Sequence, residues 1–219
     1  MMQGVTFGSL HSYTKWKLML MSRPVISPPV PKTRYVDVPG ADGALDMSET
    51  QTGYMLYKNR KITFTFVMMA DRDEWPAIYS DIMDTLHGKK VDITLDNDPL
   101  YYYTGRVTVG EWDAVNVKTA TLTMTADVLP FKTNKNYVST YKNISVTNSK
   151  TIVVTGTGNP EVPSFVVTQT MNLIYDGKSH VLTTGSAKSY SDIIIRRGEN
   201  RLTFSGTGTV TINYKGGRF

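Results

Sequence analysis

The sequence of 219 residues contains no cysteine. This absence excludes disulfide scaffolds, thiol nucleophiles and every metal site that uses cysteine ligands. Histidine is also scarce, since His11, His87 and His180 are its only occurrences and are remote from one another. We therefore expect no metal site, and the stability of the protein must come from packing.

Motifs of catalytic and cofactor-binding sites are missing as well. His180 follows Asp176-Gly-Lys-Ser, but no nucleophile motif accompanies these residues. The segment Asp96-Asn-Asp98 lacks the glycine and glutamate that complete a calcium loop. Neither Gly206-Thr-Gly208 nor Gly216-Gly217 is followed by the Lys-Ser/Thr of a phosphate loop. We expect no enzymatic activity and no cofactor.

Long apolar runs are absent too. None approaches the roughly 18 residues that a membrane-spanning helix needs, so we expect no membrane span. The formal charge of +5 comes from 24 basic and 19 acidic residues spread along the chain. Without a recognition motif, this small surplus does not predict specific nucleic-acid binding.

What the sequence does contain is mostly short strands. Alternation of apolar and polar residues over 61–67 puts Ile62, Phe64 and Phe66 on one face. One segment, 75–86, instead repeats its apolar residues at helical spacing and is followed by Gly88, which suits a helix end. The acidic residues at 71–74 suit the start of that helix. The predicted fold is mainly β with one helix.

A change in composition suggests two domains. After Val128-Leu-Pro-Phe131 the chain is rich in Lys, Asn, Ser and Thr, and no helical pattern recurs. We predict an N-terminal domain over residues 1–132 and a C-terminal domain over 133–219. Frequent turn signals in the second predict a small jelly-roll or similar β-sandwich.

Two features stand out near the N-terminus. Prolines 24, 28, 29 and 31 make a segment that cannot pair as a central strand. It is followed by a candidate structural turn that contains Pro39, Gly40, Asp42 and Gly43. Its glycines can adopt the positive backbone torsions of tight turns.

Taken in order, these features resemble one family. The order comprises Phe7-Gly8-Ser9, the proline segment, the turn within 38–45, the alternating strand, one helix ending at Gly88, and 128–131. It is similar to that of the distal tail protein of siphophages, and 197–202 with 210–214 resembles the end of that family's small galectin-like domain. The resemblance covers nearly the whole chain.

The resemblance implies a structural hub of a phage tail tip or baseplate. It implies an N-terminal β-sandwich-like domain with an extended arm, which forms a hexameric ring around the tail channel, and C-terminal galectin-like domains that project outward. The implied partners are other copies of the chain, the tail tube protein and the tail-tip lysin or fibre protein, with a receptor-binding protein as an optional addition. The implied location is the virion, after assembly in the host cytoplasm.

We interpret 48–57 as the arm that joins neighbouring subunits. Gln51, Thr52 and Gly53 are its expected tip, and Tyr54, Leu56 and Tyr57 its expected contact surface. The alternative is an ordinary solvated loop and strand within one subunit.

A carbohydrate-binding module that contacts the host cell wall is the alternative function. Sugar sites usually include an exposed aromatic platform, yet Trp16, Trp75 and Trp112 all lie in the N-terminal domain. Tyr175 and Tyr190, flanked by polar turn residues, are then the candidate sugar contacts, and core packing is the simpler explanation for them. We recognise no partners for His180 in an ordered sugar site.

Overall fold

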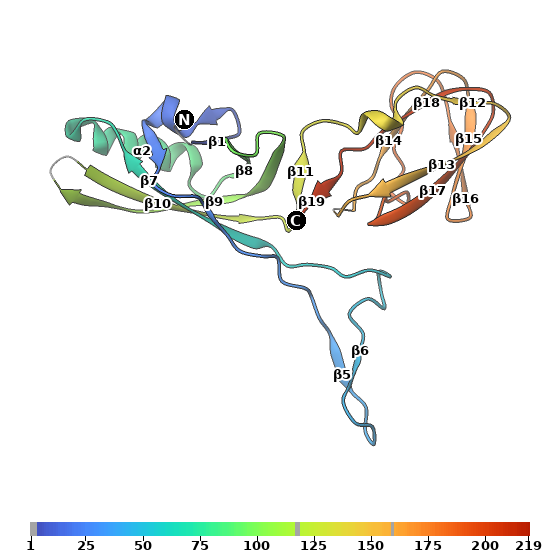
Figure 1. Ribbon diagram of the computed structural model, residues 1–219, viewed down its shortest axis with the longest axis horizontal. Helices are drawn as coiled ribbons and strands as arrows, with labels where there is room; N and C mark the ends of the chain where they lie inside the picture. The colour runs from blue at the N-terminus through green and yellow to red at the C-terminus, as the bar shows by residue number, and fades with distance from the viewer. Residues whose placement is uncertain (1–3, 117–118, 159) are drawn as a thin grey trace. The chain divides into compact units, whose positions relative to one another are not determined.

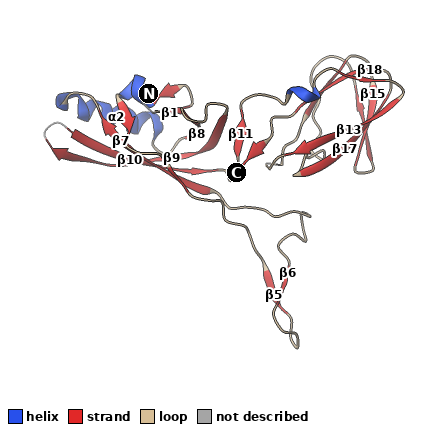
Figure 2. Ribbon diagram, in the orientation of Figure 1, coloured by secondary structure: helices blue, strands red, loops and turns tan. Residues whose placement is uncertain are grey.

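Strands dominate the computed structural model, which describes residues 4–116, 119–158 and 160–219 (Figure 2). The prediction of a mainly β fold is confirmed. The chain divides into two units, Met1–Pro130 with Phe219, and Phe131–Arg218 (Figure 1). Independent folding of the two predicted domains stays a prediction.

The first unit is built on one antiparallel sheet with the strand order β2-β1-β8-β9-β10-β7-β3, and β4 pairs with β7 beside β3. The strands are β1 (Val5–Phe7), β2 (Leu10–His11), β3 (Leu18–Leu20), β4 (Val25–Ile26), β7 (Arg60–Met68), β8 (Lys90–Leu95), β9 (Tyr101–Asn116) and β10 (Thr119–Val128). Two further strands, β5 (Tyr35–Asp37) and β6 (Ala44–Asp46), form a separate hairpin.

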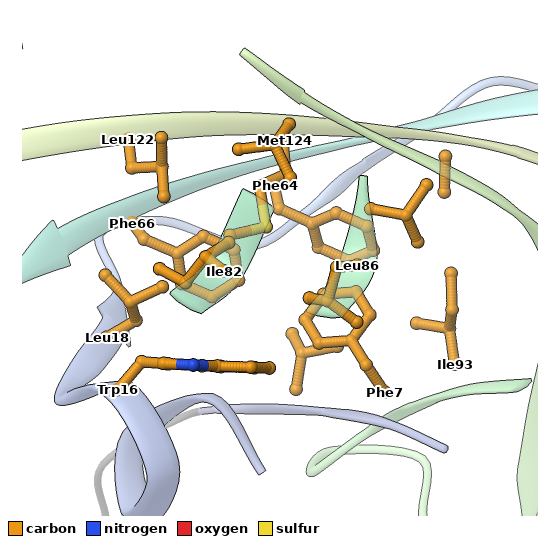
Figure 3. Packing of buried hydrophobic residues seen from close by; sticks show 14 of the residues in the cluster. Phe7, Trp16, Leu18, Phe64, Phe66, Ile82, Leu86, Ile93, Leu122 and Met124 are labelled. Carbon is orange, nitrogen blue, oxygen red and sulfur yellow. The ribbon is translucent and has the colours of Figure 1, made fainter. Parts of the chain in front are cut away.

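Alternation along the strands creates the core of the first unit. The apolar residues of β7 and β10 face inward, and Phe64, Phe66, Leu122 and Met124 are fully buried. Figure 3 shows these side chains packed with residues of the N-terminal segment and of helix α2 (Trp75–Leu86). The apolar residues that alternate with a period of two therefore form the inner face of the sheet, as predicted.

Helix α2 spans the predicted residues, but its start differs from the expectation. The acidic residues belong to a 3₁₀ turn, η1 (Arg72–Glu74), and neither Asp71 nor Glu74 makes a side-chain capping hydrogen bond. Pro76 occupies the first turn of α2, where a backbone donor is not needed.

A second, short helix was not predicted. Helix α1 (Ser12–Trp16) is too brief to show a period of 3.6, and it buries Trp16 against the core. The Trp16 Nε1 donates to Asp81 Oδ2 on α2 at 2.7 Å, and Lys15 Nζ lies 3.0 Å from the same oxygen. The short helix is therefore tied to the long one.

The second unit contains a β-sandwich. One sheet has the order β12-β18-β14 and the other β13-β17-β15-β16. The strands are β12 (Ile144–Val146), β13 (Ser149–Gly156), β14 (Ser164–Val167), β15 (Met171–Tyr175), β16 (Lys178–Leu182), β17 (Gly198–Ser205) and β18 (Gly208–Asn213). The short β11 (Lys132–Asn134) and β19 (Gly217–Arg218) pair with each other, and η2 (Ser139–Tyr141) precedes β12.

Both sheets of this sandwich contribute to one core. Phe165 and Ile212 come from the first sheet, and Leu173, Leu202 and Phe204 from the second. The Phe165 and Phe204 rings meet edge to face with centroids 6.1 Å apart. Stability in this unit thus comes from interdigitated apolar side chains, as the lack of cysteine requires.

We predict that Asp81→Asn destabilises the protein near neutral pH by about 1 kcal/mol, a value kept small because the Asp81 side chain is 44% exposed. Hydrogen bonds from Trp16, followed by Lys15, hold the pKa of Asp81 below its ordinary value of 3.8. Because the folded-state pKa is depressed, this stabilisation is present above 3.8 and is lost as the pH falls through the lowered pKa.

Urea unfolding of both proteins at about pH 7 and about pH 2 measures this difference. Asp84→Asn, a change of an exposed carboxylate on the same helix, is the control and should have little effect. An Asp81→Asn effect that is equally large in acid would show that the ion and its hydrogen bonds are not its cause.

Candidate functional site

Residues 27–59 form a two-stranded ribbon, here called the arm, that leaves the sheet between β4 and β7 (Figure 1). Backbone hydrogen bonds follow its length, from Ser27 N to Lys61 O, from Lys58 N to Val30 O and from Lys32 N to Leu56 O. Further out, β5 pairs with β6. Every residue from 31 to 46 is exposed.

Three of the prolines, Pro28, Pro29 and Pro31, lie in the outgoing limb of the arm. Pro31 forms a bridge with Tyr57 of the returning limb. A two-stranded ribbon has open edges on both sides, and a proline has no amide to offer to an added strand. Pro28, Pro29 and Pro31 therefore limit uncontrolled edge pairing along this limb.

The tip of the arm is the turn between β5 and β6. Ala41 N donates to Val38 O at 3.2 Å, and Gly40 and Gly43 have φ values of 83° and 76°. Residues other than glycine adopt such positive φ values only with steric strain. The residues proposed from sequence as a structural turn, Pro39, Gly40, Asp42 and Gly43, thus lie at the exposed end of the arm.

Just behind the tip, a polar cluster joins the two limbs. Ser48 donates to Asp46 from both its amide and its hydroxyl, and Ser48 Oγ accepts from Arg34 N at 2.8 Å. The hydrogen bonds from Ser48 hold the pKa of Asp46 below its ordinary value. An ionised Asp46 therefore helps to fix the path of an otherwise exposed ribbon.

The arm carries exposed apolar side chains. Val36 and Leu45 are paired across the ribbon and are 41% and 55% exposed. On the opposite face, Tyr35 pairs with Asp46 and is 60% exposed. Val30, Val38 and Leu56 are exposed as well. The described residues leave the face with Val36 and Leu45 exposed. A contact with another molecule could therefore bury its apolar area.

The structure places the expected tip residues elsewhere on the arm. Gln51, Thr52 and Gly53 lie in a turn of the returning limb, where Thr52 N and Gly53 N both donate to Glu49 O. They do not form the end of the ribbon. The sequence did contain a hairpin signal, the Asp42-Gly43 pair. Pairing the segments before and after it as two strands, with 44–46 as the second, would have located the tip.

The three expected contact residues lie nearer the base. Leu56 is exposed, whereas Tyr54 and Tyr57 are half-buried. The Tyr57 ring meets the Phe219 ring edge to face, with centroids 4.9 Å apart. Tyr57 is thus partly used within the chain, and a role of these residues between subunits stays a prediction.

The two candidate sugar contacts have different surroundings in the second unit. Tyr190 donates its hydroxyl to Val181 O, and its ring lies 4.4 Å from that of His180. Tyr175 donates to Ile194 O at 2.6 Å. Both pack against the sandwich core, and Tyr190 is not among the residues that line the hollow beside Tyr175.

His180 has neighbours that the sequence did not reveal. Its Nε2 lies 3.2 Å from Asp192 Oδ2, and Lys178 Nζ lies 3.5 Å from the same oxygen. These neighbours do not form a sugar site with Tyr190 or Tyr175, so the expectation that His180 has no partners in an ordered sugar site stays a prediction. Asp192 is twelve residues away in sequence and belongs to no motif with His180, so spacing alone did not signal the pair.

Within the residues that the structure describes, no group of three or more histidine, aspartate or glutamate side chains is arranged to hold a metal ion. Within the same residues, no helix has the length and apolar character needed to cross a membrane.

Comparison with known proteins finds a likeness among solved structures but none among family models. No protein-family model matches the sequence, and no curated protein does. Among solved structures, the chain is similar to the crystal structure of SPP1 Dit (gp 19.1), described as a paradigm of the hub adsorption apparatus in phages that infect Gram-positive bacteria. The match covers 98% of this chain and 99% of that chain, with a TM-score of 0.56 and 13% identity.

The chain has the Dit fold. At this identity the likeness establishes the fold alone, and it confirms the resemblance to distal tail proteins inferred from the order of motifs. Its coverage includes both units, so the likeness does not rest on the sandwich by itself.

We predict that replacing Val36 and Leu45 together by serine leaves the stability of the single chain within about 0.5 kcal/mol, because both are exposed. The matched comparison is Leu122→Ala, which removes a fully buried side chain and should cost about 2–5 kcal/mol. Chemical denaturation of dilute protein measures both. A large loss in the serine variant would mean that the arm face is already covered within one chain.

Proposed function

We propose that this protein is a structural hub of a bacteriophage tail tip or baseplate and that it carries out no reaction. The observation that carries the proposal is the Dit fold over the whole chain, because the SPP1 protein belongs to a hub adsorption apparatus. The arm agrees with it, since an exposed ribbon with an apolar face is a device for joining subunits.

The proposed assembly is a closed ring, a hexamer by the family resemblance. A ring requires head-to-tail contacts, in which the arm of one subunit contacts a different surface of the next. The residues at the tip, with Val36 and Leu45, are the proposed donor surface. Gln51, Thr52, Gly53, Tyr54, Leu56 and Tyr57 remain proposed contacts closer to the base.

The proposed partners follow from the position of a hub. One face of the ring would continue the tail tube, and the other would seat the tail-tip lysin or fibre protein, with receptor-binding proteins at the rim. The second unit, 131–218, would then project as an outer domain, and its galectin-like character is part of this proposal.

A photo-reactive amino acid in place of Leu45, which is exposed on the arm, tests the ring. We predict that irradiation of the concentrated protein gives a ladder of cross-linked species that ends at the hexamer. Each arm in a head-to-tail ring reaches the next subunit, so links accumulate around the ring.

The same residue placed at position 174 is the control, because Ile174 is an exposed apolar residue of the second unit and should give little cross-linking. A product that stops at the dimer would contradict the proposal, because a symmetric arm-to-arm contact saturates after one link. The Val36→Ser and Leu45→Ser double variant should lower the assembled mass in analytical ultracentrifugation, whereas Val153→Ser with Ile174→Ser should not.

A further inference from the structure

A hollow of about 520 Å³ lies in the second unit, where β15 ends and β17 begins. Its volume is within the range of sites for small ligands. The lining residues combine three guanidinium groups, two carboxylates, one phenol and one amide, namely Arg196, Arg197, Arg201, Asp176, Glu199, Tyr175 and Asn200.

The floor of the hollow is fixed by Asn200, which is only 6% exposed. Its Nδ2 donates to Val154 O, Arg196 O and Gly198 O at 3.2, 2.7 and 3.0 Å. Its Oδ1 accepts from Arg196 N at 2.9 Å and from the Tyr175 hydroxyl at 3.3 Å. One buried amide therefore holds the loop that presents Arg196 and Arg197.

Close packing of glycine fixes the same loop from behind. A Cβ added at Gly156 would lie 1.9 Å from Arg196 O, so only glycine lets the loop approach β13 this closely. Gly198 has a φ of 93°, which lets the chain turn sharply into β17. The arginines thus extend from a backbone with little freedom to move, which favours binding by lowering its ordering cost.

Two of the charged side chains in the hollow, those of Arg201 and Glu199, form an exposed ion pair. Arg201 Nη2 lies 3.2 Å from Glu199 Oε2, but these side chains are 70% and 65% exposed, so the pair adds little stability and can open for a ligand. Burial raises the pKa of Tyr175, and the positive charge of Arg196 opposes part of this rise. The phenol therefore remains a neutral hydrogen-bonding group near a cation.

The chemistry of these groups specifies two properties of a ligand. Arginine only donates hydrogen bonds, and its fork fits two oxygens of a phosphate or carboxylate. Carboxylates only accept, so Asp176 and Glu199 suit hydroxyl donors and would repel a ligand that is anionic throughout. A ligand that satisfies both has one anionic group with hydroxyls close to it.

We propose that this hollow binds a phosphorylated saccharide or polyol, with the phosphate held by Arg196, Arg197 and Arg201 and the hydroxyls by Asp176 and Glu199. Asn200 is a positioning residue. This site goes beyond the hub function and does not depend on ring formation. It also differs from a site built on an aromatic platform, because Tyr190 takes no part and Tyr175 contributes only one wall.

Isothermal titration of the full chain tests the proposal with three probes, α-D-glucose 1-phosphate, D-glucose and inorganic phosphate. We expect saturable binding of the sugar phosphate with a Kd of about 0.1–1 mM, and binding at least about tenfold weaker for the other two. Equal binding of D-glucose would overturn the anionic contact, and equal binding of inorganic phosphate would overturn the hydroxyl contacts. Absence of any binding at about 10 mM sugar phosphate would overturn the site itself.

Variants locate the binding. Arg197→Gln and Arg201→Gln should each weaken it about fivefold or more and reduce its dependence on salt. Arg72→Gln, an exposed arginine of the first unit, should not change it. Unchanged affinity in both hollow variants would refute the assignment to this place.

Two further measurements keep the outcome separate from that of the hub. Thermal unfolding should show that both hollow variants fold normally, because their side chains are exposed. Their assembled mass should match that of the original protein. Loss of ligand binding with unchanged mass would support the site alone. Ligand binding in a chain that forms no ring even with its tail partners would support the site and contradict the hub.

Discussion

Strand β7 is the element on which the first unit depends, because it belongs to the core and also continues into the arm. Ile62, Phe64 and Phe66 are fully buried, and a slip of one residue would turn all three toward solvent. The core therefore fixes the register of β7, and the pairing of β4 with β7 passes that register to the limbs of the arm. An isolated two-stranded ribbon is marginal in water, so its path has to be set at its base.

Arg60 marks the point where the core ends and the arm begins. It is only 6% exposed, and its guanidinium lies over the Tyr103 ring at 5.0 Å from the centroid. Burial holds the pKa of Arg60 below its ordinary value, and its Nε and Nη2 have no hydrogen-bond partner among the described residues. Such burial of a charge is costly, and the face of Tyr103 offsets part of that cost. Since Arg60 opens β7, Tyr103 on β9 restrains the root of the arm as well as the sheet.

Sequence alone predicted the elements that have a strong local signal. The alternation at 61–67 and the helical spacing at 75–86 each reflect one buried face, so β7 and α2 were found together with Gly88, whose φ is 71°. The tip of the arm was misplaced because β5 and β6 are exposed on both faces and therefore have no apolar period. The hollow was missed for a different reason. Tyr175 and Arg196 are 21 residues apart in sequence and line the same hollow only in the folded sandwich, where β15 pairs with β17.

The size of the apolar face on the arm limits what it can do by itself. Burying Val36 and Leu45 completely would contribute at most about 3–6 kcal/mol, and less here because neither starts fully exposed. Joining two proteins costs about 4–15 kcal/mol in lost translational and rotational freedom. One arm contact is therefore too weak to hold two subunits firmly, whereas a closed ring adds a contact with the last subunit without a further loss of that kind. A chain with this arm is suited to remain dispersed when dilute and to assemble when closure or a bound partner supplies the remaining free energy.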